Sequence, residues 1–257
     1  MKYNLHTHTE RCNHAEDSDR EYVEAAIAAG IEVLGFSDHC PQFFPVDDYY
    51  SFFRMKPGQL EDYVSSVLKL REEYKSDIKI LLGLEAEYYP QTFRRFSDFI
   101  ADFPLDYLIL GEHFIGNEYD YDSFYEGKSD EELLKIYVNQ VIEGLETGAF
   151  TYLAHPDNFY FRGRRSVYRS IMKKLCDYAR EKEIPLEYNM LGYLNRRNYP
   201  NPHFWKLAAE TGNKAVIGYD AHNPRALLNE RAFSECQISL KKLGVRTVEL
   251  GEMRLTP

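Results

Sequence analysis

Short apolar runs and amphipathic segments alternate along nearly the whole chain. Apolar runs with few polar interruptions are typical of strands that are buried on both faces of a parallel sheet. Such runs begin near Tyr3-Asn4-Leu5 and recur at 31–36, 78–84, 107–110, 151–154, 184–188 and 215–218. A last run, 245–250, fits either an eighth strand or a tail packed outside. Strands that alternate with helices predict an α/β fold with a parallel sheet.

The segments between these runs carry apolar residues at helical spacing and recognisable helix starts and ends. Serine followed three residues later by glutamate forms a capping box, Asn-Pro supplies an N-cap and a first-turn proline, and glycine ends helices. Helices are predicted between Ser18 and Gly30, from Leu60, between Ser129 and Gly148, from Val167, between Asn201 and Gly212, and up to Gly244.

Residues 41–58 interrupt this alternation with prolines and many aromatic side chains. The segment is longer than an ordinary connection between barrel elements, so it is either a lid or pocket wall, or a small satellite hydrophobic cluster. The chain has no Gly-, Ser- or Pro-rich linker and no internal repeat. We therefore expect one domain over residues 1–257, a length that also fits a single α/β barrel.

Composition narrows the range of partners. The formal net charge of −10 disfavours nucleic acid, because a polyanion would on average be repelled. The sequence has no long apolar run and no apolar signal core near its start, so we expect no membrane span and a cytoplasmic location. The four cysteines lack Cys-x-x-Cys spacing, and Cys12 and Cys40 are expected to pack rather than to bind metal. The oligomeric state stays open.

Polar side chains gather at the predicted strand ends. Seven of the eight histidines, together with two acidic residues, lie at or just beyond the C-terminal end of a predicted strand: His6, His8, His14, His39, Glu85, His113, His155, Asp220 and His222. That end of an α/β barrel carries the active site, because the loops after the strands converge there. The eighth histidine, His203, falls in the first turn of a predicted helix, where an exposed or capping role is expected.

These nine side chains suit metal binding. His6 and His8 are two residues apart, so a strand points both imidazoles to one side. Nine nitrogen and oxygen donors are enough for two or three divalent ions at roughly four to six ligands each. Imidazoles mixed with carboxylates, without a thiolate pair, favour zinc, manganese or iron over calcium.

The ordered series of motifs resembles a known family. His6-x-His8, His14, Asp38-His39, Gly83-x-Glu85, His113, His155-Pro156 and Asp220-x-His222 are similar to the polymerase and histidinol phosphatase (PHP) superfamily. The insert after His39, the Gly-Glu-His-Phe-Ile run at 111–115 and the stretch from Tyr199-Pro200-Asn201-Pro202 to Asp220-Ala221-His222-Asn223-Pro224 resemble its histidinol-phosphatase branch. The resemblance covers nearly the whole chain and implies a distorted (β/α)7 TIM-like barrel.

The resemblance also implies a three-metal arrangement. One ion is expected on His6, His8, Glu85 and Asp220, with Glu85 bridging to a second ion on His113 and His155. His14, His39 and His222 are expected to hold a third ion. Asp38 and Asp157 are expected to orient neighbouring imidazoles.

Clustered divalent ions would make hydroxide available near neutral pH and neutralise phosphoryl charge, which predicts phosphomonoester hydrolysis by a metal-bridging hydroxide. Asp220, Glu85 and His222 are the residues expected to take part directly. The acid that protonates the leaving group stays open between Asp220, a histidine and a metal-bound water.

Arginine suits phosphate because its planar fork donates two parallel hydrogen bonds. Arg162 and Arg197 follow the fifth and sixth predicted strands, and we expect them to bind the phosphate. Arg164 and Arg196 are close competitors, and solvated loop arginines are an equal alternative. For a cationic substrate group the candidates are Glu112, Glu187 and Asn189, although ordinary structural hydrogen bonds are the more favoured role for these three.

The resemblance gives the expected reaction as hydrolysis of L-histidinol phosphate to L-histidinol and phosphate, in histidine biosynthesis. Two alternatives are a related phosphoesterase that acts on nucleotides or DNA ends, and a non-catalytic protein in which the ions only stabilise the barrel.

Overall fold

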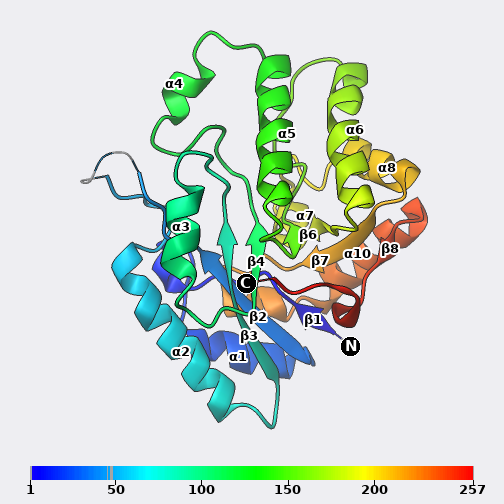
Figure 1. Cartoon of the computed structure of the whole chain (residues 1–257). Helices are drawn as coiled ribbons and strands as arrows, with labels where there is room; N and C mark the ends of the chain where they lie inside the picture. The colour runs from blue at the N-terminus through cyan, green and yellow to red at the C-terminus, as the bar shows by residue number, and fades with distance from the viewer. Residues whose placement is uncertain (1, 45, 47–48, 257) are drawn as a thin grey trace.

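The computed structural model describes residues 2–44, 46 and 49–256 of the chain and shows one sheet that curls on itself, with helices around its outside (Figure 1). The strands follow chain order in the sheet, and each neighbouring pair is parallel. They are β1 (Tyr3–Asn4), β2 (Val33–His39), β3 (Lys79–Ala86), β4 (Tyr107–Leu110), β5 (Tyr152–Leu153), β6 (Leu186–Asn189), β7 (Lys214–Gly218) and β8 (Arg246–Thr247). The predicted α/β barrel-like fold is confirmed.

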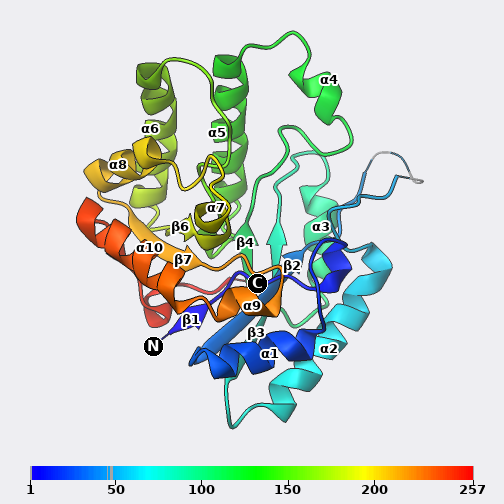
Figure 2. The same cartoon turned by 180° about the vertical axis from the view of Figure 1, so that it is seen from behind.

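The helices form the outer layer, which both views show (Figures 1 and 2). They are α1 (Asp19–Ala28), α2 (Leu60–Glu73), α3 (Phe93–Ile100), α4 (Tyr121–Tyr125), α5 (Asp130–Glu146), α6 (Arg165–Glu181), α7 (Met190–Leu194), α8 (Pro202–Thr211), α9 (Pro224–Leu227) and α10 (Glu230–Leu243). Three short 3-10 helices cover Glu10–Cys12, Pro57–Gln59 and Leu250–Glu252. The predicted capping boxes of α1 and α5 are present, and the Asn201 side chain caps α8. The sequence pattern did not reveal α3, α4, α7 and α9.

Alternate residues of each strand enter two different cores. On β3, Ile80, Leu82 and Leu84 pack outward against the helices, within the large core cluster. Leu81 points inward and belongs to a smaller cluster that includes Tyr107 and fills the barrel interior. Because side chains alternate along a strand, Glu85 lies on the same inward face as Leu81, above this filled interior. The site therefore rests on packed apolar side chains.

In the described part of the chain, the first and seventh strands meet beyond their carboxyl ends. Beyond β1 and β7, Thr7 forms an isolated parallel bridge with Ala221, and the His8 amide donates to the Ala221 carbonyl at 2.9 Å. At the other end β8 pairs with β7, and the Tyr3 hydroxyl donates to the Val248 carbonyl at 2.8 Å. The eighth strand that the sequence left open thus forms, and this two-residue strand is added to the seven that the resemblance implied.

Strands β2 and β3 run further toward the site than the apolar runs indicated. The observed β2 reaches His39 and the observed β3 reaches Ala86, whereas the apolar runs stop at 36 and 84. Their register pairs His39 with Glu85. Two polar residues therefore end adjacent strands side by side, although apolar patterning alone would have placed both in loops. Over the part of the chain described here, every helix is too short or too polar to cross a membrane.

Candidate metal centre

All nine side chains singled out from the strand ends converge at the carboxyl end of the barrel. Each of them belongs to at least one group in which three potential ligand atoms lie within 4.8 Å of one another: His14–His39–His222, His6–His8–Glu85, His6–His155–Asp220 and His39–Glu87–His113. Six of the nine line a cavity of about 400 Å³, namely His14, His39, Glu85, His113, Asp220 and His222, and its walls also include Arg197 and Tyr199. The strand ends thus form one polar pocket.

Glu85 is at the centre of this pocket, and its two carboxylate oxygens face different groups of imidazoles. Oε2 lies 3.5 Å from Nε2 of both His6 and His8, and 3.0 Å from Nδ1 of His39. Oε1 lies 2.9 Å from Nε2 of His155 and 3.8 Å from Nε2 of His113. A carboxylate placed in this way can bridge two cations.

In the deepest part of the pocket, imidazole nitrogens and carboxylate oxygens lie close together with few hydrogen-bond partners. The Nδ1 atom of His6 donates to Glu187 at 2.7 Å, which leaves Nε2 as the nitrogen that faces the other ligand atoms. That Nε2 lies only 3.1 Å from Nε2 of His8, which in turn is 3.2 Å from Asp220 Oδ1. Glu85 Oε2 is buried, and no described residue makes a hydrogen bond with it. Because buried polar atoms are normally satisfied, a shared cation explains this arrangement, and the donor set fits divalent metals.

A second group of histidines, made of His14, His39 and His222, lies nearer the surface. His14 Nδ1 donates to the Cys12 carbonyl at 2.8 Å, and His222 Nδ1 donates to the Asp220 carbonyl at 3.0 Å. Both rings therefore direct Nε2 away from the backbone. His14 and His222 stack with ring centroids 4.7 Å apart, and His39 is 5.2 Å from His14. These three residues are the ones expected to share the third ion.

The electrostatics of the cluster also fit bound cations. Burial alone would lower the pKa of His6, but Glu187, Asp220 and Glu85 raise it well above its ordinary value. Burial would raise the pKa of Glu85, but the imidazoles of His39, His6 and His113 hold it well below its usual range. The carboxylates are therefore ionised and attract positive charge, which divalent ions can supply in place of protons.

His39 behaves differently from His6. Burial, with only partial compensation by Glu85, lowers the pKa of His39 to about 3. The ring is therefore neutral near neutral pH, and a neutral imidazole is the form that coordinates metals.

Two glycines make room for the buried carboxylates. A Cβ at Gly111 would lie 1.9 Å from Glu85 Oε1, and one at Gly218 would lie 1.7 Å from Glu187 Oε1. Neither position tolerates a side chain without moving the carboxylate beside it. The sequence analysis did not assign these glycines a role, although each one directly follows or ends a strand.

Glu187 was a candidate for a cationic substrate group in the sequence analysis, with an ordinary structural hydrogen bond as the favoured role, and it proves to support the expected metal ligands. Its Oε1 accepts from His6, and its Oε2 accepts from the His155 amide at 3.0 Å and from Asn189 at 2.9 Å. Asn189 also donates to Asp220 Oδ2 at 3.0 Å. Glu112 accepts from Gln140 and from the Tyr88 amide. The structural role favoured for these three residues fits, and a glutamate at an inward position of an apolar strand was the available signal.

The two aspartates expected to orient imidazoles differ from each other. Asp38 Oδ1 lies 3.5 Å from His8 Nδ1, and its other oxygen accepts from the Thr9 hydroxyl. Asp157 instead accepts from the Asn201 amide at 2.5 Å, and no hydrogen bond to an imidazole is found for it among the described residues. The carboxylate of Asp157 is thus engaged by the N-cap residue of α8.

The arginines lie at the mouth of the pocket. Arg197 is exposed, lines the 400 Å³ cavity and donates to the Tyr199 hydroxyl at 2.7 Å. Arg162 lies in a neighbouring cavity of about 550 Å³, which shares His113 with the first, and its guanidinium is 5.4 Å from the Tyr160 ring. Arg164 and Arg196 are exposed, as is His203 in the first turn of α8. The roles of Arg162 and Arg197 in phosphate binding stay predictions.

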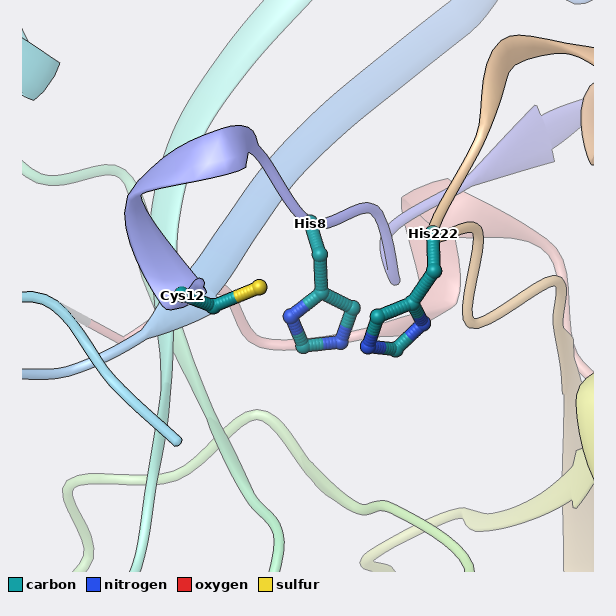
Figure 3. A group of neighbouring side chains, drawn as sticks. All are labelled: His8, Cys12 and His222. Carbon is teal, nitrogen blue, oxygen red and sulfur yellow. The ribbon is translucent and has the colours of Figure 1, made fainter. Parts of the chain in front are cut away.

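Cys12 lies next to two of the histidines, His8 and His222. Its side chain is buried, and Figure 3 shows the sulfur pointing toward His8, with His222 on the other side of that ring. The three residues are close enough to share an ion. However, burial raises the pKa of Cys12, and a protonated thiol is a poor ligand, so packing remains the better interpretation.

The segment 41–58 contributes one pocket wall. Phe53, which is 51% exposed, packs edge-on against Phe114 and lines the 400 Å³ cavity. Tyr50 and Phe52 are also exposed, which argues against a closed satellite cluster. Residues 45, 47 and 48 of this segment lie outside the described residues, and the lid stays a prediction.

Comparison with known proteins identifies the family. The PHP domain model matches residues 4–190, which is most of the chain. The chain belongs to the PHP domain family. The expected resemblance to this family is therefore confirmed, and the PHP match covers the ends of β1 to β6, where seven of the nine converging side chains are found.

Two curated relatives match nearly the whole of this chain. A probable histidinol-phosphatase of Deinococcus radiodurans is 28% identical over 98% of this chain and 97% of its own length. A histidinol-phosphatase of Lactococcus lactis is 26% identical over 97% of this chain and 82% of its own length.

Solved structures share the fold. A histidinol phosphate phosphatase from Lactococcus lactis, in complex with zinc, L-histidinol and phosphate, superposes with a TM-score of 0.71 at 22% identity, over 96% of this chain and 95% of that one. A putative histidinol phosphatase from Listeria monocytogenes gives a TM-score of 0.70 at 21% identity, over 88% of this chain and 97% of that one. Both likenesses support the PHP barrel described above.

Proposed function

We propose that the protein is a metal-dependent phosphatase that hydrolyses L-histidinol phosphate to L-histidinol and phosphate. The observation that carries the proposal is the placement of Glu85, which offers one oxygen to each of two buried groups of imidazoles. Of the two curated relatives that match nearly the whole chain, one is named a histidinol-phosphatase and the other a probable histidinol-phosphatase. Their names supply the substrate, and the geometry supplies the reaction class.

Three groups of side chains in the pocket would hold three divalent ions, for which zinc, manganese and iron are the candidates. His6, His8, Glu85 and Asp220 form the first group, Glu85 with His113 and His155 the second, and His14, His39 and His222 the third. When bound, such ions lower the pKa of coordinated water and neutralise the charge of a phosphoryl group. The zinc in the Lactococcus lactis structure supports this chemistry for the fold.

The residues around these groups would orient and neutralise the substrate. Arg197 at the pocket mouth would bind phosphate oxygens, and Arg162 would reach the same substrate from the adjoining cavity, next to His113. Although burial would raise it, the pKa of Asp220 is held well below its ordinary range by His6, His222 and His8. Asp220 is therefore an anion when substrate arrives. This favours a ligand role for Asp220, and a histidine or a water as the source of the proton for the leaving alkoxide.

Phosphate release by one zinc-loaded preparation tests the proposal. L-histidinol phosphate is compared with nucleoside monophosphates and with an oligonucleotide that carries a 3′-phosphate. Turnover of histidinol phosphate with much higher kcat/KM than the others supports the proposal. Faster release from nucleotides or from the oligonucleotide would favour the related phosphoesterase, and release from none of them would favour a non-catalytic metal protein.

A further inference from the structure

Arg54 of the 41–58 segment is an unusually buried arginine. Its side chain is 2% exposed, and its guanidinium is enclosed by acceptors on several sides. Nη1 donates to Glu87 Oε2 at 2.6 Å and Nη2 donates to Glu87 Oε1 at 2.8 Å, so the pair is bidentate. Nε donates to Glu118 Oε2 at 3.0 Å, and the Cys40 carbonyl and the Tyr89 hydroxyl each lie 3.4 Å from a terminal nitrogen. The guanidinium is therefore held in one orientation.

Glu87 connects this arginine to the pocket. Besides its two contacts with Arg54, Glu87 Oε1 accepts from Nδ1 of His113 at 2.9 Å. Because Nδ1 of His113 carries the proton, the lone pair is on Nε2, which faces Glu85 Oε1 at 3.8 Å. Glu87 is close enough to His39 and His113 to share an ion with them. However, both of its oxygens are already engaged by Arg54 and His113, so Glu87 suits an orienting role better than a ligand role.

Stability alone is a weak explanation for this buried network. Replacing a buried ion pair with well-packed apolar residues is often neutral or stabilising, because taking the charges out of water is costly. By contrast, a carboxylate that fixes the tautomer and the direction of a metal-ligating imidazole strengthens metal binding. His113 has particular need of such support, because its side chain is 29% exposed whereas that of His155 is 3% exposed.

The network also joins three separate loops. Arg54 comes from the long segment after β2, Glu87 directly follows β3, and Glu118 lies in the loop after β4. The Tyr49 hydroxyl donates to Glu118 Oε1 at 3.1 Å, which gives the long segment a second contact with the same loop. The position of residues 49–54 of this segment is thus linked to the orientation of His113.

We propose that Arg54 is a positioning residue for the metal ligand His113 and acts through Glu87, so that the position of residues 49–54 and metal binding at His113 are coupled. The proposal rests on the metal centre proposed above. It predicts that a residue of the long segment, which does not touch the ion, determines how tightly the ion shared by His113, His155 and Glu85 is held.

Equilibrium zinc titration in competition with a chromophoric chelator tests this coupling on the full chain. In Arg54→Met and in Glu87→Gln, one of the zinc sites is expected to weaken about 10- to 100-fold, while the remaining sites keep the wild-type affinity. The double variant should weaken it no further than the stronger single variant, because both changes break the same connection. Arg54→Lys retains the charge without the bidentate fork and should recover only part of the affinity.

Arg20→Met is the matched control, because Arg20 also forms a bidentate pair with a glutamate, Glu73, but on the surface and away from the pocket. Circular dichroism melting of each variant confirms folding before zinc is added, and Glu87→Gln serves as the readout if Arg54→Met does not fold. If Arg54→Met and Glu87→Gln bind zinc as tightly as Arg20→Met does, the inference is overturned and the proposed function stays intact. Wild-type protein that binds no zinc would overturn both.

Discussion

The floor and the rim of the pocket are built in opposite ways. The floor, which we define as His6, His8, Glu85 and Asp220, has side chains that are at most 6% exposed. The rim, defined as Arg162 and Arg197, is exposed, and its two guanidinium groups lie in different cavities. The floor is fixed by hydrogen bonds before any ligand arrives, whereas the rim is free to adapt. This difference supports the proposed division, in which the floor would bind the metal ions and the rim would select the substrate.

The largest effect is expected from a floor ligand. Asp220→Asn removes a negative charge from between His6, His8 and His222, and asparagine tolerates the positive φ of 50° at this position. Loss of several kcal/mol of charge stabilisation corresponds to a roughly 10³-fold fall in kcat. Steady-state phosphate release and zinc content measure the effect. Asp77→Asn, an exposed aspartate outside the pocket, is the control, and a variant with normal kcat would favour ions that only stabilise the barrel.

A smaller but still large effect is expected at Gly111, the glycine that lies against the floor residue Glu85. Gly111→Ala would place a Cβ against Glu85 Oε1 and push that carboxylate away from His155. A displacement of about 1 Å can cost about 100-fold, so kcat should fall by about that factor and zinc should bind more weakly. Gly251→Ala, which has open space around its Cβ, is the control. Equal zinc affinity in the two variants would show that the position of Glu85 is not fixed as tightly as the floor requires.

Rim substitutions should separate the two regions. Arg197→Lys keeps the charge but loses the planar fork, so KM for histidinol phosphate should rise about tenfold while zinc affinity stays unchanged. Arg162→Lys is expected to act in the same direction. Arg94→Lys, an almost fully exposed arginine on α3, provides the reference. A fall in zinc content in either rim variant would contradict the division between floor and rim.

A prediction about stability alone concerns Asp157, a buried carboxyl group that has no imidazole partner among the described residues. Burial raises the pKa of Asp157 to about 7, so the folded protein keeps a proton that the unfolded chain loses above about pH 4. This group therefore lowers stability as pH rises from about 4 to 7, by at most about 1.4 kcal/mol per pH unit. Asp157→Asn should remove that part of the slope in urea unfolding at several pH values.

In the same urea unfolding experiment, carried out without metal, the floor carboxylates should give the opposite dependence of stability on pH. The pKa values of Glu85 and Asp220 are held below their ordinary values, so the stability that these residues contribute is present above about pH 4 and is lost as pH falls further. An Asp157→Asn variant with an unchanged slope would mean that Asp157 is ionised in the folded protein.

The sequence predicted the floor because its residues coincide with regular signals. His6, Glu85 and Asp220 follow or end apolar strands, and parallel strands bring their carboxyl ends to one edge. The side chains that support the floor carry no such signal. Glu187 reaches His6 across 181 positions and Arg54 reaches Glu87 across 33, and pairings at such separations depend on how the barrel closes. Apolar periodicity does not encode that closure.

The apolar pattern of the sequence also missed the true end of β2 and the short helix α9. The apolar pattern ended β2 at residue 36 because Ser37, Asp38 and His39 are polar, yet these residues are buried and continue the ladder with β3. Polar ligands within a strand look like loop residues when a sequence is read by hydrophobicity. The one-turn helix α9 is too short to show helical periodicity.

Zinc stoichiometry at equilibrium tests the central claim most directly. Wild-type protein, stripped with a chelator and then titrated with zinc, should bind three ions per chain, and Glu85→Gln should lose more than one of them because Glu85 faces two groups of ligands. Wild-type protein that takes up no zinc, or a Glu85→Gln variant that binds as many ions as the wild type, would contradict the account.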